Sequence, residues 1–256
     1  MAAEYARFAA ISCTHCPFQS ERAISKLLQE LKGRNLTHFL HLGDVINADS
    51  ASQWNDDPTK HSLSDEFVIA ANMLKRIREA LSPDTKCILF DGNHDDNVQK
   101  SGRIQHDLRS LLDPRKIEGV SDEYNLWEKV PYVCGVRGTY QIGACIFAHG
   151  YSASVNSDEM EAIVLAQACG GWSHRLIVRG HTHRPVPPTQ CKRSARVVLP
   201  WHYANVGHMA FQERAEYTKR YSIESWGRAM LVGSCKMGRA DRLPKNSWQA
   251  QLISLD

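Results

Sequence analysis

The sequence has no long apolar run and no leader-like beginning. None of its apolar stretches approaches the roughly 20 residues that a membrane-spanning helix needs. Residues 1–7 lack a basic region followed by an apolar core, so we expect no signal peptide. These absences predict a cytoplasmic protein that does not associate with a membrane.

Little excess charge of either sign is present. The formal net charge of +3 over 256 residues gives no general attraction to nucleic acid or to a membrane surface. Basic residues cluster only at Lys192–Arg193 with Arg196, and at Lys219–Arg220. Because no aromatic residues are interleaved with them, we interpret both clusters as solvated surface, and nucleic acid is not favoured as a partner.

The chain lacks internal repeats, low-complexity tracts and any segment with the composition of a linker. Its 256 residues are enough to build one large core. We therefore predict a single domain over residues 1–256. The sequence gives no indication of the oligomeric state.

A disulfide framework is not indicated, although the sequence has eight cysteines. Cys87, Cys134 and Cys145 fall in strand-like runs, where a free thiol behaves as a small buried hydrophobe. Without an export signal, a reducing compartment is expected. Cys13 and Cys16 form a C-x-x-C, so a redox pair or a zinc knuckle is an alternative use, but no second C-x-x-C accompanies it.

Hydrophobic periodicity predicts a mixed α/β chain. A helix that begins at a Ser20 cap and ends at Gly33 carries its apolar residues on one face, at Ile24, Leu27, Leu28 and Leu31. A second helix, capped by Ser64, has its apolar face at Phe67, Ala70, Leu74, Ile77 and Leu81. Strand-like runs flank both helices, which predicts parallel strands joined by right-handed crossovers.

After residue 130 the pattern changes to short apolar runs separated by glycines, which favours antiparallel strands. We predict strands at 132–136, 139–142, 144–147, 175–178, 196–199, 221–225 and 228–232, and a helix at 157–169. Residues 96–113 are expected to be partly helical. Residues 47–62 and 185–196 are predicted to be loops, the second because it is rich in proline and basic residues.

Five of the strand-like runs end in glycine or in side chains that bind metals. These endings are Cys13-Thr14-His15, Gly43-Asp44, Gly92-Asn93-His94-Asp95, His149-Gly150 and Gly180-His181-Thr182-His183. Ligands of α/β proteins gather outside the carboxyl ends of the strands, so we expect these endings to share one site. A turn at residues 92–95, or a structural role for a lone histidine such as His149, is the alternative for each ending taken alone.

This ordered set resembles the calcineurin-like metallophosphoesterase superfamily. The family pattern is Asp-x-His, Gly-Asp, Gly-Asn-His-(Asp/Glu), a lone His and Gly-His-x-His. The resemblance covers residues 8–183 and departs at one position, where Cys13 stands in place of the family's first aspartate. It implies an α/β fold of two mixed β-sheets packed as a β-sandwich, with helices outside in a four-layer αββα arrangement.

The resemblance also implies a centre of two divalent or trivalent metal ions, with Zn, Fe or Mn expected. The first ion would be held by Cys13, His15, Asp44 and His183. The second would be held by Asn93, His149 and His181, with Asp44 bridging the two. In this arrangement the ions lower the pKa of a bridging water, so that hydroxide forms near neutral pH and attacks phosphorus.

Two residues next to the ligands are implied to be catalytic. His94 would stabilise charge developing on the phosphate or protonate the leaving group. Asp95 would hold the His94 ring in the required tautomer. We interpret Cys13 as a thiolate ligand, because a metal-bound thiolate carries the same charge as a carboxylate and its longer metal–sulfur bond compensates for the shorter side chain.

The expected function is hydrolysis of a phosphomonoester or a phosphodiester. Two alternatives stay open: a non-catalytic binding scaffold whose metal site has degraded, and a nuclease that acts on DNA ends. His94 and Asp95 favour the enzyme, because a degraded site has no need of them, and the modest charge counts against the nuclease. His202 and Asn205 are further candidates for the substrate pocket, and the remaining histidines are interpreted as structural or solvent-facing.

Overall fold

Alternation of apolar strands with amphipathic helices builds the first part of the chain. In the computed structural model, β1 (Tyr5–Ile11), β2 (His38–His41) and β3 (Lys86–Phe90) run parallel, joined by α1 (Glu21–Leu31) and α2 (Leu63–Glu79). The structure describes residues 5–51, 61–104, 112–154, 156–171, 174–211, 225–238, 243–244 and 247–256. Among these residues, no helix is long and apolar enough to cross a bilayer.

Serine caps begin both long helices. The hydroxyl of Ser20 accepts a hydrogen bond from the Ala23 amide, which confirms the predicted cap of α1. The prediction that Ser64 caps α2 was wrong. The cap is Ser62, because its hydroxyl accepts from the Asp65 amide at 3.1 Å and the helix already begins at Leu63.

Two mixed sheets are formed. The first has six strands in the order β11-β10-β1-β2-β3-β4, with β4 at Glu128–Val130, β10 at Ala229–Lys236 and β11 at Trp248–Ser254. The second has five strands in the order β5-β6-β7-β9-β8. These are β5 at Thr139–Ile142, β6 at Cys145–Ala148, β7 at Leu176–Arg179, β8 at Pro185–Ser194 and β9 at Val197–Val206. Each sheet contains parallel and antiparallel pairs. In the first sheet, for example, β1 pairs parallel with β2 and antiparallel with β10.

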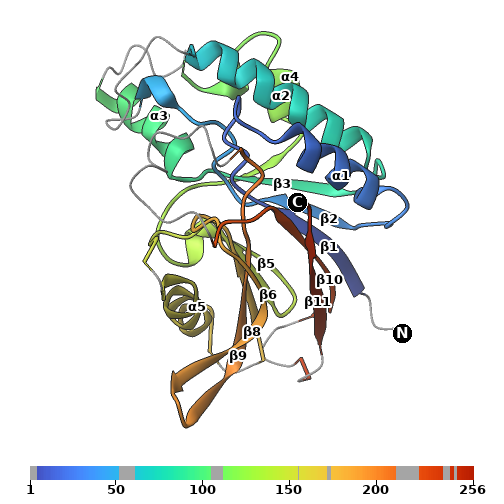
Figure 1. Cartoon of the computed structure of the whole chain (residues 1–256), viewed down its shortest axis with the longest axis vertical. Helices are drawn as coiled ribbons and strands as arrows, with labels where there is room; N and C mark the ends of the chain where they lie inside the picture. The colour runs from blue at the N-terminus through green and yellow to red at the C-terminus, as the bar shows by residue number, and fades with distance from the viewer. Residues whose placement is uncertain are drawn as a thin grey trace.

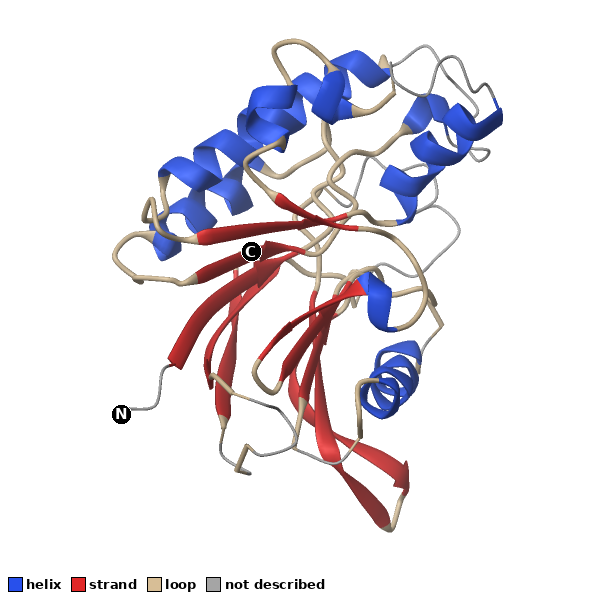
Figure 2. Cartoon of the chain, turned by 180° about the vertical axis from the view of Figure 1, so that it is seen from behind, coloured by secondary structure: helices blue, strands red, loops and turns tan. Residues whose placement is uncertain are grey.

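The sheets pack face to face, and helices cover their outer faces (Figures 1 and 2). Phe8 of β1 and Phe147 of β6 meet edge-to-face across the interface, with ring centroids 5.1 Å apart. Helices α1 to α4 cover the six-stranded sheet, with α3 at Asn93–Ile104 and α4 at Ser121–Tyr124, while α5 (Ser157–Ala168) covers the other sheet. This confirms the predicted arrangement of two mixed sheets flanked by helices.

The predicted loop at 185–196 is instead a strand. Residues of β8 (Pro185–Ser194) pair antiparallel with β9 (Val197–Val206), and the two form a hairpin that projects from the body in Figure 1. Proline is tolerated because β8 is the edge strand of its sheet and needs no donor on its outer side. The pairing register shifts between Val186 and Thr189, around the two consecutive prolines.

Other predictions differ in their outcome. The strands at 139–142 and 144–147, their antiparallel pairing, and the helix at 157–169 are confirmed within a residue or two. The strand predicted at 132–136 was wrong, since these residues contain no strand and lead into a 3₁₀ turn at Val136–Gly138. Further 3₁₀ turns in the described residues lie at Asp49–Ala51 and Pro114–Lys116. Most of the strand predicted at 221–225, and most of the loop at 47–62, lie outside the described residues.

Candidate metal centre

The five strand endings converge at one end of the two sheets. Cys13 and His15 follow β1, Asp44 follows β2, and Asn93 and His94 begin α3 directly after β3. From the second sheet, His149 follows β6, and His181 and His183 follow β7. The grouping predicted from the sequence therefore brings side chains from both sheets to a shared, largely buried cluster.

Strained backbone turns point these side chains inward. Cys13, His15, Asp44, His181 and His183 all have left-handed φ angles, between 46° and 68°. Residues other than glycine rarely adopt this conformation, and such strain concentrates where function requires a particular side-chain direction. The same turns leave no room for extra atoms, since a Cβ on Gly92 would lie 2.1 Å from Oδ1 of Asp44.

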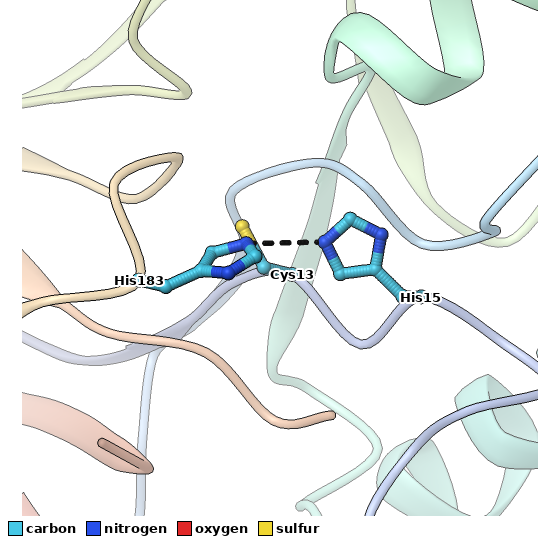
Figure 3. Close-up of side chains that lie close together, drawn as sticks. All are labelled: Cys13, His15 and His183. Atoms are coloured by element: carbon cyan, nitrogen blue, oxygen red, sulfur yellow. Dashed lines mark hydrogen bonds between the residues drawn. The ribbon is translucent and has the colours of Figure 1, made fainter. Parts of the chain in front are cut away.

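Cys13, His15 and His183 form one group of converging donors (Figure 3). Nε2 of His15 lies 3.1 Å from Nε2 of His183, so the two rings point these nitrogens toward each other. Burial holds the pKa of His15 and of His183 well below the usual value, which keeps both imidazoles neutral. Burial and the charge of Asp44 raise the pKa of the Cys13 thiol.

A second group gathers around His149. Its Nδ1–H donates to the Leu42 carbonyl at 2.6 Å, which turns Nε2 toward Oδ2 of Asp44 at 3.2 Å and Oδ1 of Asn93 at 3.1 Å. Burial acts to lower the pKa of His149, but the charge of Asp44 outweighs it and the pKa is raised, so the protonated ring pairs with the Asp44 carboxylate. The His181 ring lies 5.1 Å from that of His149, and burial lowers the His181 pKa to about 3.

Asp44 lies between the two groups. Its Oδ2 is 3.9 Å from Sγ of Cys13, 3.9 Å from Nε2 of His15 and 3.2 Å from Nε2 of His149. Burial acts to raise the pKa of Asp44, but the surrounding histidines outweigh it and the carboxyl remains ionised. A thiol, imidazoles, a carboxamide and a carboxylate gathered together are a donor set that fits transition-metal ions.

The histidine next to Asn93 also faces the cluster. Nδ1 of His94 lies 2.6 Å from the Asn47 carbonyl, and its backbone amide donates to Oδ1 of Asp44 at 3.0 Å. The rings of His94 and His15 meet edge-to-face with centroids 4.6 Å apart. These contacts hold the His94 ring against the cluster.

The prediction that Asp95 orients His94 was wrong. The Asp95 carboxylate accepts hydrogen bonds from four backbone amides, those of Asp44, Val45, Ile46 and Gly92. It therefore fixes the turn that carries Asp44. Burial and the charges of Asp44 and Asp91 raise the pKa of Asp95 to about 7, against the opposing effect of the Gly92 amide.

A buried arginine that the sequence analysis did not single out holds the His149 loop. Arg179, at the end of β7, is fully buried between Asp158 at 3.3 Å and Glu161 at 3.2 Å, and it donates to the Ser152 carbonyl at 2.9 Å. Only glycine fits at Gly150, because a Cβ there would lie 2.3 Å from the Arg179 guanidinium. The sequence hints at this role only through the position of Arg179, a basic residue at the end of an apolar strand.

Asn205 supports the loop that carries His181 and His183. Its side-chain amide donates to the Gly180 carbonyl at 2.8 Å, to Oγ1 of Thr182 at 2.9 Å and to Asp158 at 2.8 Å. Asn205 is fully buried, and these hydrogen bonds give it a role in holding the loop, while its predicted place in a substrate pocket stays a prediction. His202 packs against Trp248, with ring centroids 5.2 Å apart.

The chain is similar to a known protein family. A family model described as calcineurin-like phosphoesterase matches residues 6–185. No curated protein sequence matches the chain.

Several solved structures are similar in fold. Vps29 from Cryptosporidium parvum has a TM-score of 0.44 and 12% identity, with 98% of each chain covered. Wild-type Vps29 from Entamoeba histolytica complexed with zinc has a TM-score of 0.40 and 12% identity, covering 98% of this chain and 99% of that one. PhoD has a TM-score of 0.42 and 8% identity, covering 98% of this chain and 68% of that one.

Proposed function

Because the chain belongs to the calcineurin-like phosphoesterase family, we propose that it is a metal-dependent hydrolase of a phosphomonoester or a phosphodiester. The observation that supports this is the convergence of thiol, imidazole and carboxylate donors from both sheets into mutually close groups. The cluster also contains His94, which the proposed ligand set does not require.

In this proposal Asp44 is shared between two ions. Cys13, His15 and His183 would hold the first ion with it, and Asn93, His149 and His181 would hold the second. When bound, the ions would supply Lewis acidity and lower the pKa of a water molecule, so that a nucleophile is available near neutral pH. The neutral imidazoles contribute electron pairs without adding positive charge, and the ionised Asp44 partly balances the charge of the ions.

His94 would move the proton that the leaving group needs. Its Nδ1–H is held by the Asn47 carbonyl, so Nε2 is the atom that carries a proton to the leaving oxygen. The hydrogen bond from its amide to Asp44 keeps the ring at a fixed position relative to the proposed bridging ligand. Asp95 contributes indirectly, by fixing the turn that presents Asp44.

The test combines metal analysis with hydrolysis of a generic aryl phosphomonoester and an aryl phosphodiester. We expect two ions per chain and metal-dependent turnover of at least one ester. Asp44→Ala should lose both ions or nearly all activity, because it is the only carboxylate of the proposed ligand set, whereas Asp84→Ala, an exposed aspartate outside the cluster, should match the parent.

Two outcomes would contradict the proposal. An Asp44→Ala variant that keeps two ions and full activity would show that Asp44 is not the bridge. Stoichiometric metal with no turnover of either ester class would favour the scaffold alternative, for which Cys13 in the ligand set is the supporting observation.

A further inference from the structure

A cavity of about 540 Å³ lies behind the candidate metal centre, on the side of α2 and α3. Much of its wall is apolar, and the residues that form this part include Ile46, Phe67, Leu89, Val98 and Leu112. Its volume falls within the roughly 300–1,000 Å³ of small-molecule sites, which are mainly apolar with a few polar groups that fix orientation.

The cavity borders the metal cluster through Asp95, the only proposed site residue in its wall. The Asp95 carboxylate is occupied by the amides of Asp44, Val45, Ile46 and Gly92. None of the proposed metal ligands lines the cavity. It is therefore separate from the candidate active site, although an occupant would lie against the turn that carries Asp44.

The acidic groups in this wall are all engaged. Asp91 forms an ion pair with Lys129 at 2.9 Å and accepts a hydrogen bond from Gln99 at 2.8 Å. The ion pair balances the charge of Lys129 as well as that of Asp91. Asp113 accepts from the backbone amide of Arg115 at 3.1 Å. Lys129 therefore balances the charge of Asp91, and Asp113 is anchored to the backbone beside Arg115.

Arg115 and Lys116 are two basic side chains in the same wall. Arg115 donates through Nη2 to the Trp127 carbonyl at 3.1 Å, a neutral acceptor that occupies one of its five N–H donors. Lys116 is exposed beside it. Within the described part of the chain, neither side chain lies within ion-pair distance of a carboxylate. An arginine with spare donors suits a carboxylate, which it binds through charge-assisted hydrogen bonds.

We propose that this cavity binds a small amphipathic carboxylate, with its carboxylate at Arg115 and Lys116 and its apolar body against Phe67, Val98 and Leu112. The basic rim supplies the charge complement, and the apolar wall supplies burial for a short aliphatic or aromatic body. The site does not depend on the proposed hydrolase activity.

Calorimetric titration of the full chain with octanoate and with octanamide tests the proposal. The two probes share the same apolar body and differ only in charge. Octanoate should bind about tenfold more tightly, the difference expected for a hydrogen bond to a charged group. Arg115→Gln should remove most of that preference, and Arg193→Gln, which deletes an exposed arginine on the distant hairpin, should leave it unchanged.

Leu112→Trp provides a second variant, because filling the cavity should weaken binding of both probes. Circular dichroism melts confirm that each variant is folded. The proposal is overturned if octanoate and octanamide bind equally or not at all. It is also overturned if octanoate binding survives both Arg115→Gln and Leu112→Trp unchanged, since the carboxylate would then lie elsewhere, such as at the metal ions.

Discussion

Cys13 occupies the position where the metallophosphoesterase pattern has aspartate, and its surroundings bear on whether it can act as a ligand. The side chain is fully buried, with Sγ 3.1 Å from the Ser12 hydroxyl and 3.9 Å from Asp44. Burial and the Asp44 charge raise the pKa of the thiol, so a nearby cation is needed to deprotonate it. The other proposed ligands of the first ion are in place, which is unexpected for an abandoned site.

We predict that Cys13 changes the metal preference without abolishing binding. Thiolate is a soft ligand, so the first site should prefer zinc or iron over manganese or magnesium, and Cys13→Asp should shift the preference toward manganese. Cys13→Ala and Cys13→Ser should empty the first site. Metal content and activity of these variants are measured across a panel of divalent ions.

Cys16→Ala is the matched control, because Cys16 is equally buried but its Sγ contacts the sulfur of Met73 at 3.9 Å. Equal loss of metal in Cys16→Ala would favour the C-x-x-C alternative. A Cys13→Ala variant with the parent's occupancy and preference would exclude the thiolate as a ligand and support the scaffold.

His94→Ala should keep both ions and lose most turnover. A group that moves a proton in the transition state contributes about 10²–10⁴-fold, and the His94 ring is not among the proposed ligands. The measurement is metal content beside the turnover number, with His38→Ala as the control on a histidine remote from the cluster. Because one nitrogen of His94 also lies within 4.8 Å of donors on His15 and Asp44, loss of metal as severe as in Asp44→Ala would reassign it as a ligand.

Single residues show where sequence reasoning reaches its limit. The proposed ligands were identifiable because each follows an apolar strand that places it at the same edge. Asp95 was assigned the wrong partner because the amide of Asp44 lies 51 residues away in the sequence, and only the fold shows how close the two are. His208 was interpreted as structural, and it is buried with its ring stacked 5.1 Å from that of His183.

At the scale of elements, the helices and central strands were predictable and the edges were not. Periodicity identified α1 and α2, since each buries one apolar face against a sheet, and the helix α5 was also predicted. The strand β8 was predicted as a loop because it contains several prolines. Proline is compatible with a strand only at the edge of a sheet, and the sequence does not show that β8 is an edge strand. The strand β11 was not predicted, and its position depends on pairing with β10, which the local sequence does not reveal.

The link between β7 and α5 has an energetic consequence that can be measured. Arg179→Met should destabilise the protein by about 3–5 kcal/mol, because it leaves the buried carboxylate of Asp158 and the partly buried carboxylate of Glu161 without their counter-charge. Arg34→Gln removes a surface pair with Glu30 and should cost at most about 1 kcal/mol.

The free energies of unfolding of the two variants and of the parent are measured by urea denaturation and compared. Equal, small losses would mean that the two carboxylates near Arg179 find other compensation. Metal content of Arg179→Met should also fall, because the loop that carries His149 depends on the hydrogen bond from Arg179 to the Ser152 carbonyl.

At the scale of the whole molecule, residues after 185, beyond the family match, supply strands that complete both β-sheets. The match ends at residue 185, but β9 lies between β7 and β8, and β10 pairs with β1. Later residues also hold the ligand loops, since the Met209 amide donates to the Cys13 carbonyl at 3.0 Å and the Gly227 amide to the His183 carbonyl at 3.1 Å. These contacts support our proposal that residues 1–256 form one domain.

A chain truncated after Pro185 should therefore neither unfold cooperatively nor bind metal, as judged by circular dichroism melts and metal analysis. It would lack the β10 partner of β1 and the β9 partner of β7, which exposes two central strands of the sandwich. The control is the full chain cut only at the exposed hairpin turn near Ala195, where a protease site interrupts the backbone without removing a strand. The cut chain should keep its fold and its ions. If the truncated chain instead melts cooperatively and holds two ions, the matched segment is an independent domain, and the later strands are an addition to it.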